Sequence, residues 1–190
     1  MLRTMRMNSE RGKRYATAAD FVEIYNEEMR SLFLLSILLT ADAEKAEQCF
    51  VNGLEECLSG FDVSIDWARM WARRAIIKHA ITLVKPRPEQ PNFKPLTGLQ
   101  WNSKPANDNF IRAIFSLGTF DRFVFVMSLL ERQSDEDCSV LLNCRRRDIE
   151  SARREAMKSL SDTGTDCNPF EEALQAWWII HARKSMQLGI

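Results

Sequence analysis

A cluster of arginines around residue 150 carries the most interpretable chemistry of this sequence. Guanidinium groups hold phosphates and donate paired hydrogen bonds to guanine, so several arginines on one short segment suit contact with duplex DNA. A serine between them adds a hydroxyl to the same segment. The predicted DNA contacts are Arg145, Arg146, Arg147, Ser151, Arg153 and Arg154.

The residues around this cluster predict a helix-turn-helix. Ser134 and Asp137 have the spacing of a helix capping box, and Asn143 lies where the chain must turn, since asparagine tolerates the left-handed conformation. A second helix is predicted next, because apolar residues recur at helical spacing and leave the arginines outside. Its buried stripe would be Ile149, Ala152, Ala156 and Leu160. In a helix-turn-helix the second helix lies in the major groove of DNA.

An ordinary helical hairpin with a solvated charged face is the alternative interpretation. Asp148, Glu150 and Glu155 dilute the positive charge and favour that alternative. The hairpin residues alone do not decide between the two, and charge elsewhere in the chain favours DNA binding.

Charge is segregated along the N-terminal half, although the formal net charge of the chain is zero. Residues 17–66 carry eleven acids against two basic residues, whereas residues 67–85 carry five basic residues and no acid. Such segregation makes a local positive field of the kind that attracts nucleic acid. The predicted phosphate contacts of this segment are Arg69, Arg73, Arg74 and Lys78.

Two tryptophans lie four residues apart within this basic segment. Aromatic rings at that spacing can stack on the bases of opened DNA or belong to the hydrophobic core. We expect Trp71 to be a core residue, and Trp67 remains a candidate for base stacking.

Composition predicts an all-α protein with substantial hydrophobic cores. The 190 residues are 45% hydrophobic and 27% charged, with only seven glycines. The five cysteines form no Cys-x-x-Cys pair and have no histidine at ligand spacing, so we expect reduced structural thiols, no metal site and no cofactor. The most apolar run, residues 32–39, is far shorter than the ~20 residues that span a bilayer. We therefore expect a cytoplasmic protein without a membrane segment.

The prolines divide the chain, because five of the six lie between residues 86 and 105. In the final segment Asn168 and Pro169 predict the start of one more helix, whose Trp177 and Trp178 we expect to complete a core. The predicted division is a basic tail at 1–16, a helical module at 17–84, a proline-rich linker at 85–109, a second helical module at 110–160 and a C-terminal extension at 161–190.

The sequence does not indicate an enzyme. Its two histidines, His79 and His181, lack the neighbours of a metal site or of an activated nucleophile. No glycine-rich phosphate loop or dinucleotide fingerprint is found. A binding protein is the better expectation.

The two modules together resemble a small bacterial RNA polymerase sigma factor of the extracytoplasmic-function type. The resemblance covers roughly residues 18–84 and 112–160, and it is carried by Phe-Val-Glu-Ile-Tyr at 21–25, by the segment at 38–47 and by the tryptophan- and arginine-bearing segment at 67–78. It implies a transcription initiation factor that binds core RNA polymerase and promoter DNA. The helix at 67–78 would meet the minus-ten element, and the helix-turn-helix would read the minus-thirty-five element. An anti-sigma protein is a further candidate partner.

The chain departs from the family pattern at the helix that grips the polymerase clamp. An acid followed by a Gln-Glu pair is replaced by Gln48, Val51 and Asn52. The candidate polymerase contacts are therefore Glu44, Glu47, Gln48, Val51, Asn52 and Glu55. This departure supports an alternative function, in which a sigma-fold DNA-binding regulator or protein-interaction module has lost polymerase binding.

Overall fold

The computed structural model describes residues 14–60, 62–88 and 105–161, and at 105–110 it describes the backbone alone. Within these ranges the chain is helical, with no strand and one isolated bridge between Tyr15 and Ser64, which confirms the all-α class. No helix in this part of the chain is both long and apolar enough to cross a membrane. The predicted C-terminal helix, most of the linker and most of the basic tail lie outside the described residues.

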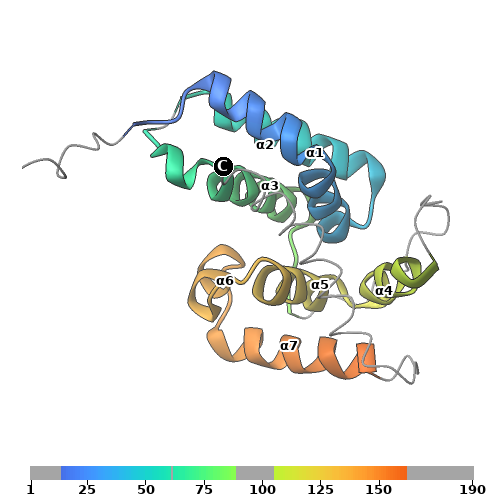
Figure 1. Ribbon diagram of the computed structural model, residues 1–190. Helices are drawn as coiled ribbons and strands as arrows, with labels where there is room; N and C mark the ends of the chain where they lie inside the picture. The colour runs from blue at the N-terminus through green and yellow to red at the C-terminus, as the bar shows by residue number, and fades with distance from the viewer. Residues whose placement is uncertain (1–13, 61, 89–104, 162–190) are drawn as a thin grey trace, which may run out of the picture.

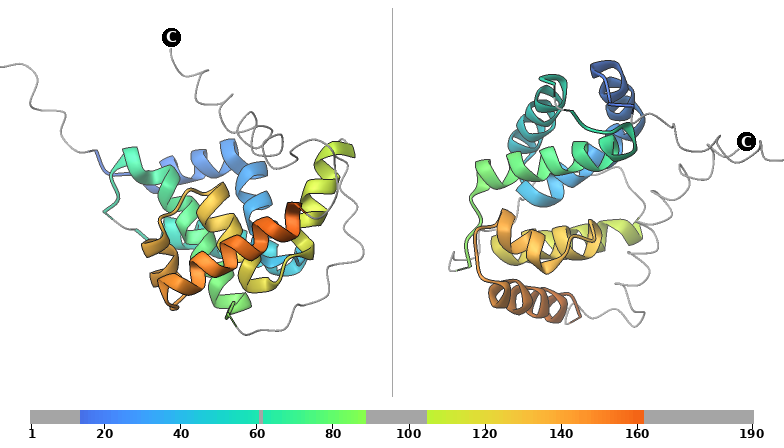
Figure 2. Two further views of the ribbon diagram at one scale, coloured as in Figure 1. Left: turned by 90° about the horizontal axis from the view of Figure 1, so that it is seen from below. Right: turned by 90° about the vertical axis from the view of Figure 1, so that its left-hand side faces the viewer.

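The elements follow one another as α1 (Ala18–Thr40), α2 (Ala43–Leu58), the 3-10 turn η1 (Ile65–Trp67), α3 (Ala68–Val84), α4 (Pro105–Ser116), α5 (Thr119–Phe125), the π-helical turn η2 (Val126–Leu130), α6 (Asp135–Leu141) and α7 (Arg146–Ser161). Helices α1, α2 and α3 pack on one another and form one layer, and α5, α6 and α7 form a second layer beneath it (Figure 1). Figure 2 shows that α7 lies on the side of the second layer that faces away from α1–α3.

Side-chain caps define the starts of the first two helices. The Thr17 hydroxyl accepts the Asp20 N–H at 3.3 Å, and the Asp20 carboxylate accepts the Thr17 N–H at 2.8 Å, so the two residues form a capping box. The Asp42 carboxylate accepts the Lys45 N–H at 3.1 Å at the start of α2. These local bonds satisfy amides that a helix cannot pair internally.

A glycine lets α2 approach its two neighbours closely. A methyl group built on Gly53 would lie 2.9 Å from Tyr25 Oη and 3.0 Å from Ile76 Cγ1. Tyr25 belongs to α1 and Ile76 to α3, so all three helices of the first layer meet at this point. A larger residue at Gly53 would have to separate them.

The helix-turn-helix begins and turns as predicted. The Ser134 hydroxyl accepts the Asp137 N–H at 3.0 Å at the start of α6. Asn143 has a φ of 48°, the left-handed conformation that ends α6 and redirects the chain toward α7. The Asp148 carboxylate accepts the Arg145 N–H at 3.1 Å and so caps the start of α7.

The buried apolar side chains of both layers form one continuous cluster. Its members from the second layer include Phe115, Phe120, Phe123, Phe125 and Met127. Helix α1 makes the link, since it contacts both α5 and η2. Contact between the layers therefore buries apolar surface, which is the main favourable contribution to packing.

The proline-rich segment differs from its prediction at its C-terminal end. Residues 105–109, predicted as linker, form the start of α4. Pro105 occupies the first helical position, where the missing N–H of proline leaves no hydrogen bond unmade. At the other end of the segment, Lys85 ends α3 with a φ of 53° and Pro86 follows, as a proline boundary predicts.

Candidate nucleic-acid interface

The predicted arginine cluster lies on the open face of α7. The exposed members are Arg145, Arg146, Arg147, Ser151 and Arg154. The opposite face carries the predicted stripe of Ile149, Ala152, Ala156 and Leu160, all buried. Because α7 is the outermost helix of its layer, its arginine face is accessible to a rigid surface such as a DNA duplex (Figure 1).

The ion pairs on this face are weak enough to exchange for phosphate. Arg146 Nε lies 3.4 Å from Glu150 Oε1, and Arg147 Nε lies 3.8 Å from Asp148 Oδ1. The two arginine side chains are 69% and 71% exposed. Exposed pairs of this kind contribute about 0–1 kcal/mol, so an approaching phosphate meets little competition.

Arg153 has a different environment from the other arginines of α7. Its guanidinium binds the Asp135 carboxylate in the first turn of α6, and its side chain is 27% exposed. The pair therefore ties the two helices of the helix-turn-helix together. This placement gives Arg153 a structural partner that the sequence spacing did not indicate.

Three of the four predicted phosphate contacts of α3 are also engaged by acids. Arg69 binds Glu27 at 2.5 Å and Glu28 at 2.6 Å, both on α1. Lys78 Nζ lies 2.8 Å from Glu56 Oε1 on α2. The segment has no acid of its own, but packing supplies acids from the neighbouring helices.

Arg73 joins the two layers. Its Nε and Nη2 donate to Glu131 at 2.6 and 2.5 Å, and its Nη1 donates to Ser31 Oγ at 2.9 Å. The side chains of Arg73 and Glu131 are only 18% and 6% exposed. Burial by itself would lower the pKa of Arg73, but the bonds and charge of Glu131, together with Glu28, outweigh it and raise that pKa. A guanidinium held in this way is not available to phosphate.

An exposed stripe remains on α3 and η1. Trp67 is 59% exposed and Met70 is 54% exposed. Arg74, four residues further, is exposed and makes no ion pair within the described part of the chain. Trp71 packs against the core, as expected. An aromatic ring, a thioether and a cation on one face suit stacking on bases beside a phosphate.

Met70 of that stripe was not among the residues predicted from the sequence. Its signal is its position three residues after Trp67, on the face that α3 does not bury. Large apolar residues exposed beside one another mark contact surfaces more often than single ones do.

The candidate polymerase contacts share the outer face of α2. Glu44, Glu47, Gln48, Val51 and Glu55 are exposed, and Asn52 is partly exposed. Val51 is 44% exposed at the centre of this acidic face. The opposite face packs inward through Ala46, Cys49 and Gly53. The face is therefore accessible to a macromolecular partner.

The described cysteines are free thiols, and all but Cys144 are buried. Burial raises the pKa of Cys138 to about 12 and those of Cys49 and Cys57 to about 11. In the described ranges no group of three or more histidine, cysteine, aspartate or glutamate side chains could hold a metal ion. Cys167 lies outside these ranges.

Comparison of the chain with protein-family models, with curated proteins and with solved structures finds no match. The features of the molecule that bear on its function are therefore the arginine face of α7, the exposed stripe of α3 and the outer face of α2.

Proposed function

We propose that this chain is a transcription factor of the sigma-factor type, which binds promoter DNA and directs core RNA polymerase to it. The observation that carries the proposal is the exposed arginine face of α7, preceded by a capped α6 and a left-handed turn at Asn143. In this arrangement α7 enters the major groove with its N-terminal residues nearest the bases. Arg146 and Arg147 are the best placed for this contact.

The exposed stripe of α3 supports a second contact, with the opened strand. Trp67 offers a ring for base stacking, and Arg74 offers a cation for the adjacent phosphate. The outer face of α2, centred on Val51, is the proposed contact with polymerase. These assignments follow the order of regions that the resemblance implies.

The ion pairs of α3 favour a second candidate function. Arg69, Arg73 and Lys78 are held by carboxylates, which reduces the positive charge offered to an opened strand. The second candidate is a regulator that binds duplex DNA through α7 without binding polymerase. Such a regulator would make the duplex contact of α7 but would contact neither the opened strand nor polymerase.

The proposal is tested by measuring binding to core RNA polymerase and run-off transcription from a selected promoter. Polymerase binding that supports transcription, and that Val51→Glu abolishes, is the expected result. Exposed Val140 on α6 gives the control variant Val140→Glu, which is expected to leave polymerase binding unchanged. Salt-sensitive duplex binding without polymerase binding would instead establish the second candidate.

Duplex binding is tested on α7 itself by fluorescence anisotropy. Arg147→Ala is expected to weaken binding by about 1–3 kcal/mol if the arginine reads a base. Lys158→Ala, at the opposite end of the same exposed helix, is expected to have little effect. Equal effects of the two variants would contradict the proposed entry of the N-terminal end of α7.

A further inference from the structure

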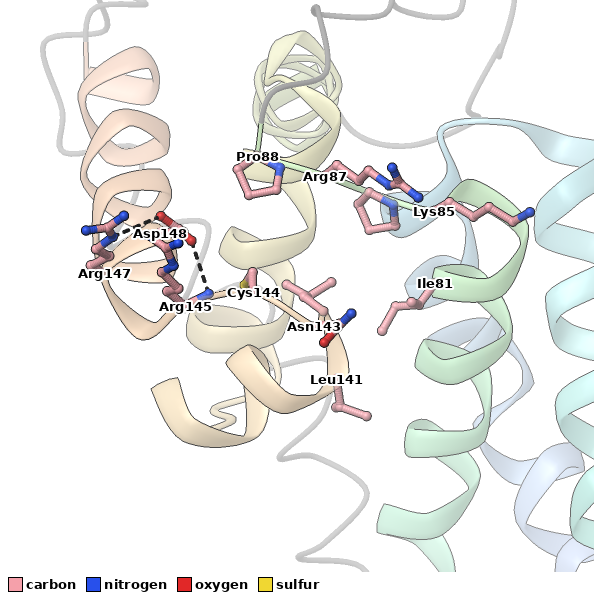
Figure 3. A pocket seen from close by; sticks show the side chains of 12 residues that line it. Ile81, Lys85, Arg87, Pro88, Leu141, Asn143, Cys144, Arg145, Arg147 and Asp148 are labelled. Carbon is pink, nitrogen blue, oxygen red and sulfur yellow. Dashed lines mark hydrogen bonds and ion pairs between the residues drawn. The ribbon is translucent and has the colours of Figure 1, made fainter.

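A cleft of about 1010 Å³ lies between the end of α3 and the turn that precedes α7 (Figure 3). Its apolar lining comes from both layers and comprises Ile81, Pro86, Pro88, Leu141 and Leu142. Lys85 and Arg87 line one side, and Arg145 and Arg147 line the other, as Figure 3 shows. Two chain segments that lie far apart in the sequence thus bring four basic residues to the border of one cleft, where the Lys85 side chain points away from α7 (Figure 3).

The backbone that carries the cations of the α3 side is fixed at Lys85 and Pro86. Lys85 closes α3 in the left-handed conformation, and its N–H donates to Ile81 O at 2.8 Å. Pro86 is buried, so it fixes the direction of the chain that follows. Lys85 and Arg87 are exposed, and within the described ranges neither takes part in an ion pair.

The charge of this cleft is positive even when its acid is counted. Among the described residues that line it, Asp148 is the one acid. Its carboxylate accepts the Arg145 N–H at 3.1 Å and lies 3.8 Å from Arg147 Nε. The acid therefore serves the start of α7 and leaves the cations on the other side of the cleft uncompensated.

We propose that Lys85 and Arg87 bind the phosphate backbone of the duplex whose groove α7 enters. The inference rests on the proposed duplex binding by α7 and adds a contact from the other layer. A recognition helix in a major groove has phosphates on both sides, and the cleft borders the first turn of α7. The cations lie along two sides instead of converging on one point, which suits an extended polyanion better than a small anion (Figure 3).

This contact gives the segment after α3 a role in placing the helix-turn-helix on DNA. Phosphate contacts fix the register and orientation of a protein on the duplex and carry no sequence information themselves. Lys85 and Arg87 should therefore strengthen binding to all sequences alike. Because they belong to the first layer, the duplex would be held by both layers at once.

The test compares the full-length chain with the double variant Lys85→Gln and Arg87→Gln in duplex binding at several salt concentrations. The logarithm of the binding constant falls linearly with the logarithm of the salt concentration. Each lost phosphate contact reduces the magnitude of this slope by about 0.9, so the double variant should reduce it by about 1.8. The same relation predicts a loss of affinity of roughly 30-fold at 0.15 M salt, equal for cognate and random duplexes. Arg30→Gln with Lys45→Gln, two exposed cations of the first layer, is the matched control and should change neither quantity.

The outcomes separate this inference from the proposed function. If Arg147→Ala weakens duplex binding while the Lys85 and Arg87 variant retains the parent slope, the inference is wrong and the helix-turn-helix assignment stands. If the parent chain shows no salt-sensitive duplex binding, both are overturned. A loss confined to one DNA sequence would also overturn the inference, because phosphate contacts do not discriminate between sequences. Urea unfolding of the variant should match that of the parent, which shows that the fold is intact.

Discussion

Replacing Arg73 by methionine should destabilise the protein more than any other change of a charged residue on α3. The substitution keeps most of the side-chain volume but leaves the Glu131 carboxylate, which is 6% exposed, without its bidentate partner. Breaking a buried ion pair by removing one partner costs about 3–5 kcal/mol. For a chain of this size, that loss corresponds to a fall in Tm on the order of 10 °C.

The matched control lies one turn earlier on the same helix. Arg69 binds two carboxylates at similar distances, but its side chain is 46% exposed. Exposed pairs contribute about 0–1 kcal/mol, so Arg69→Met should be nearly neutral. Comparing the two variants isolates burial as the cause, because helix, residue type and partner type are the same.

The assay is urea unfolding followed by circular dichroism, with thermal unfolding as a second measurement. A double variant, Arg73→Met with Glu131→Leu, should recover most of the stability, because apolar residues often replace a buried ion pair without loss. The reasoning is refuted if Arg73→Met unfolds within about 1 kcal/mol of Arg69→Met. It is also refuted if the double variant is no more stable than Arg73→Met alone.

Three further predictions follow from burial. Gly53→Ala should lower the free energy of unfolding by about 1–3 kcal/mol, because its methyl would lie 2.9 Å from Tyr25 Oη; urea unfolding checks this. At pH 8 iodoacetamide should label Cys144 before Cys138, because burial raises the pKa of Cys138 to about 12 and keeps that thiol protonated; peptide mass mapping gives the order. Arg122→Met should keep or raise Tm, because burial lowers the pKa of this guanidinium to about 10 and its hydrogen bonds are 3.4 Å or longer.

Local rules predicted the features whose causes lie within a few residues. The Ser134 and Asp137 cap, the left-handed Asn143 and the buried stripe of α7 all follow from contacts between near neighbours in the chain. Helix α3 ends at Val84, just before Pro86, because proline disfavours a helical conformation at the residue that precedes it. The same proline rule placed the end of the linker too late, because Pro105 begins a helix instead of breaking one.

Such local rules cannot predict the ion-pair partners of the α3 cations. Arg73 and Glu131 are 58 residues apart, and Arg69 and Glu27 are 42 apart, so no spacing argument pairs them. A run of cations without acids predicts a positive surface only where the neighbouring elements contribute no acids. Here α1, α2 and the end of η2 all do, and Arg74 alone of the four predicted α3 cations makes no ion pair within the described ranges. Arg146 and Arg147 of α7 escape this effect because α7 lies at the outside of its layer (Figure 2), whereas Arg153 does not, since Asp135 of α6 binds it.

The two candidate functions place different demands on the contact between the two layers. Minus-ten and minus-thirty-five elements lie about 25 base pairs apart, which is about 85 Å along B-DNA. We therefore expect an initiation factor that contacts both at once to part the layers and break the Arg73–Glu131 pair, whereas a regulator that holds one duplex through α7 and the adjoining cleft can keep them closed.

A cross-link between the layers tests this difference. The test protein carries Arg73→Cys and Glu131→Cys in a background without Cys144 and Cys167. Because the long side chains of Arg73 and Glu131 hold their backbones too far apart for a disulfide, a bis-maleimide is used to join the two thiols. For an initiation factor, the cross-linked protein should bind duplex DNA but fail in run-off transcription, and the same protein before cross-linking is the control. Full transcription by the cross-linked protein would show that initiation does not require the layers to separate.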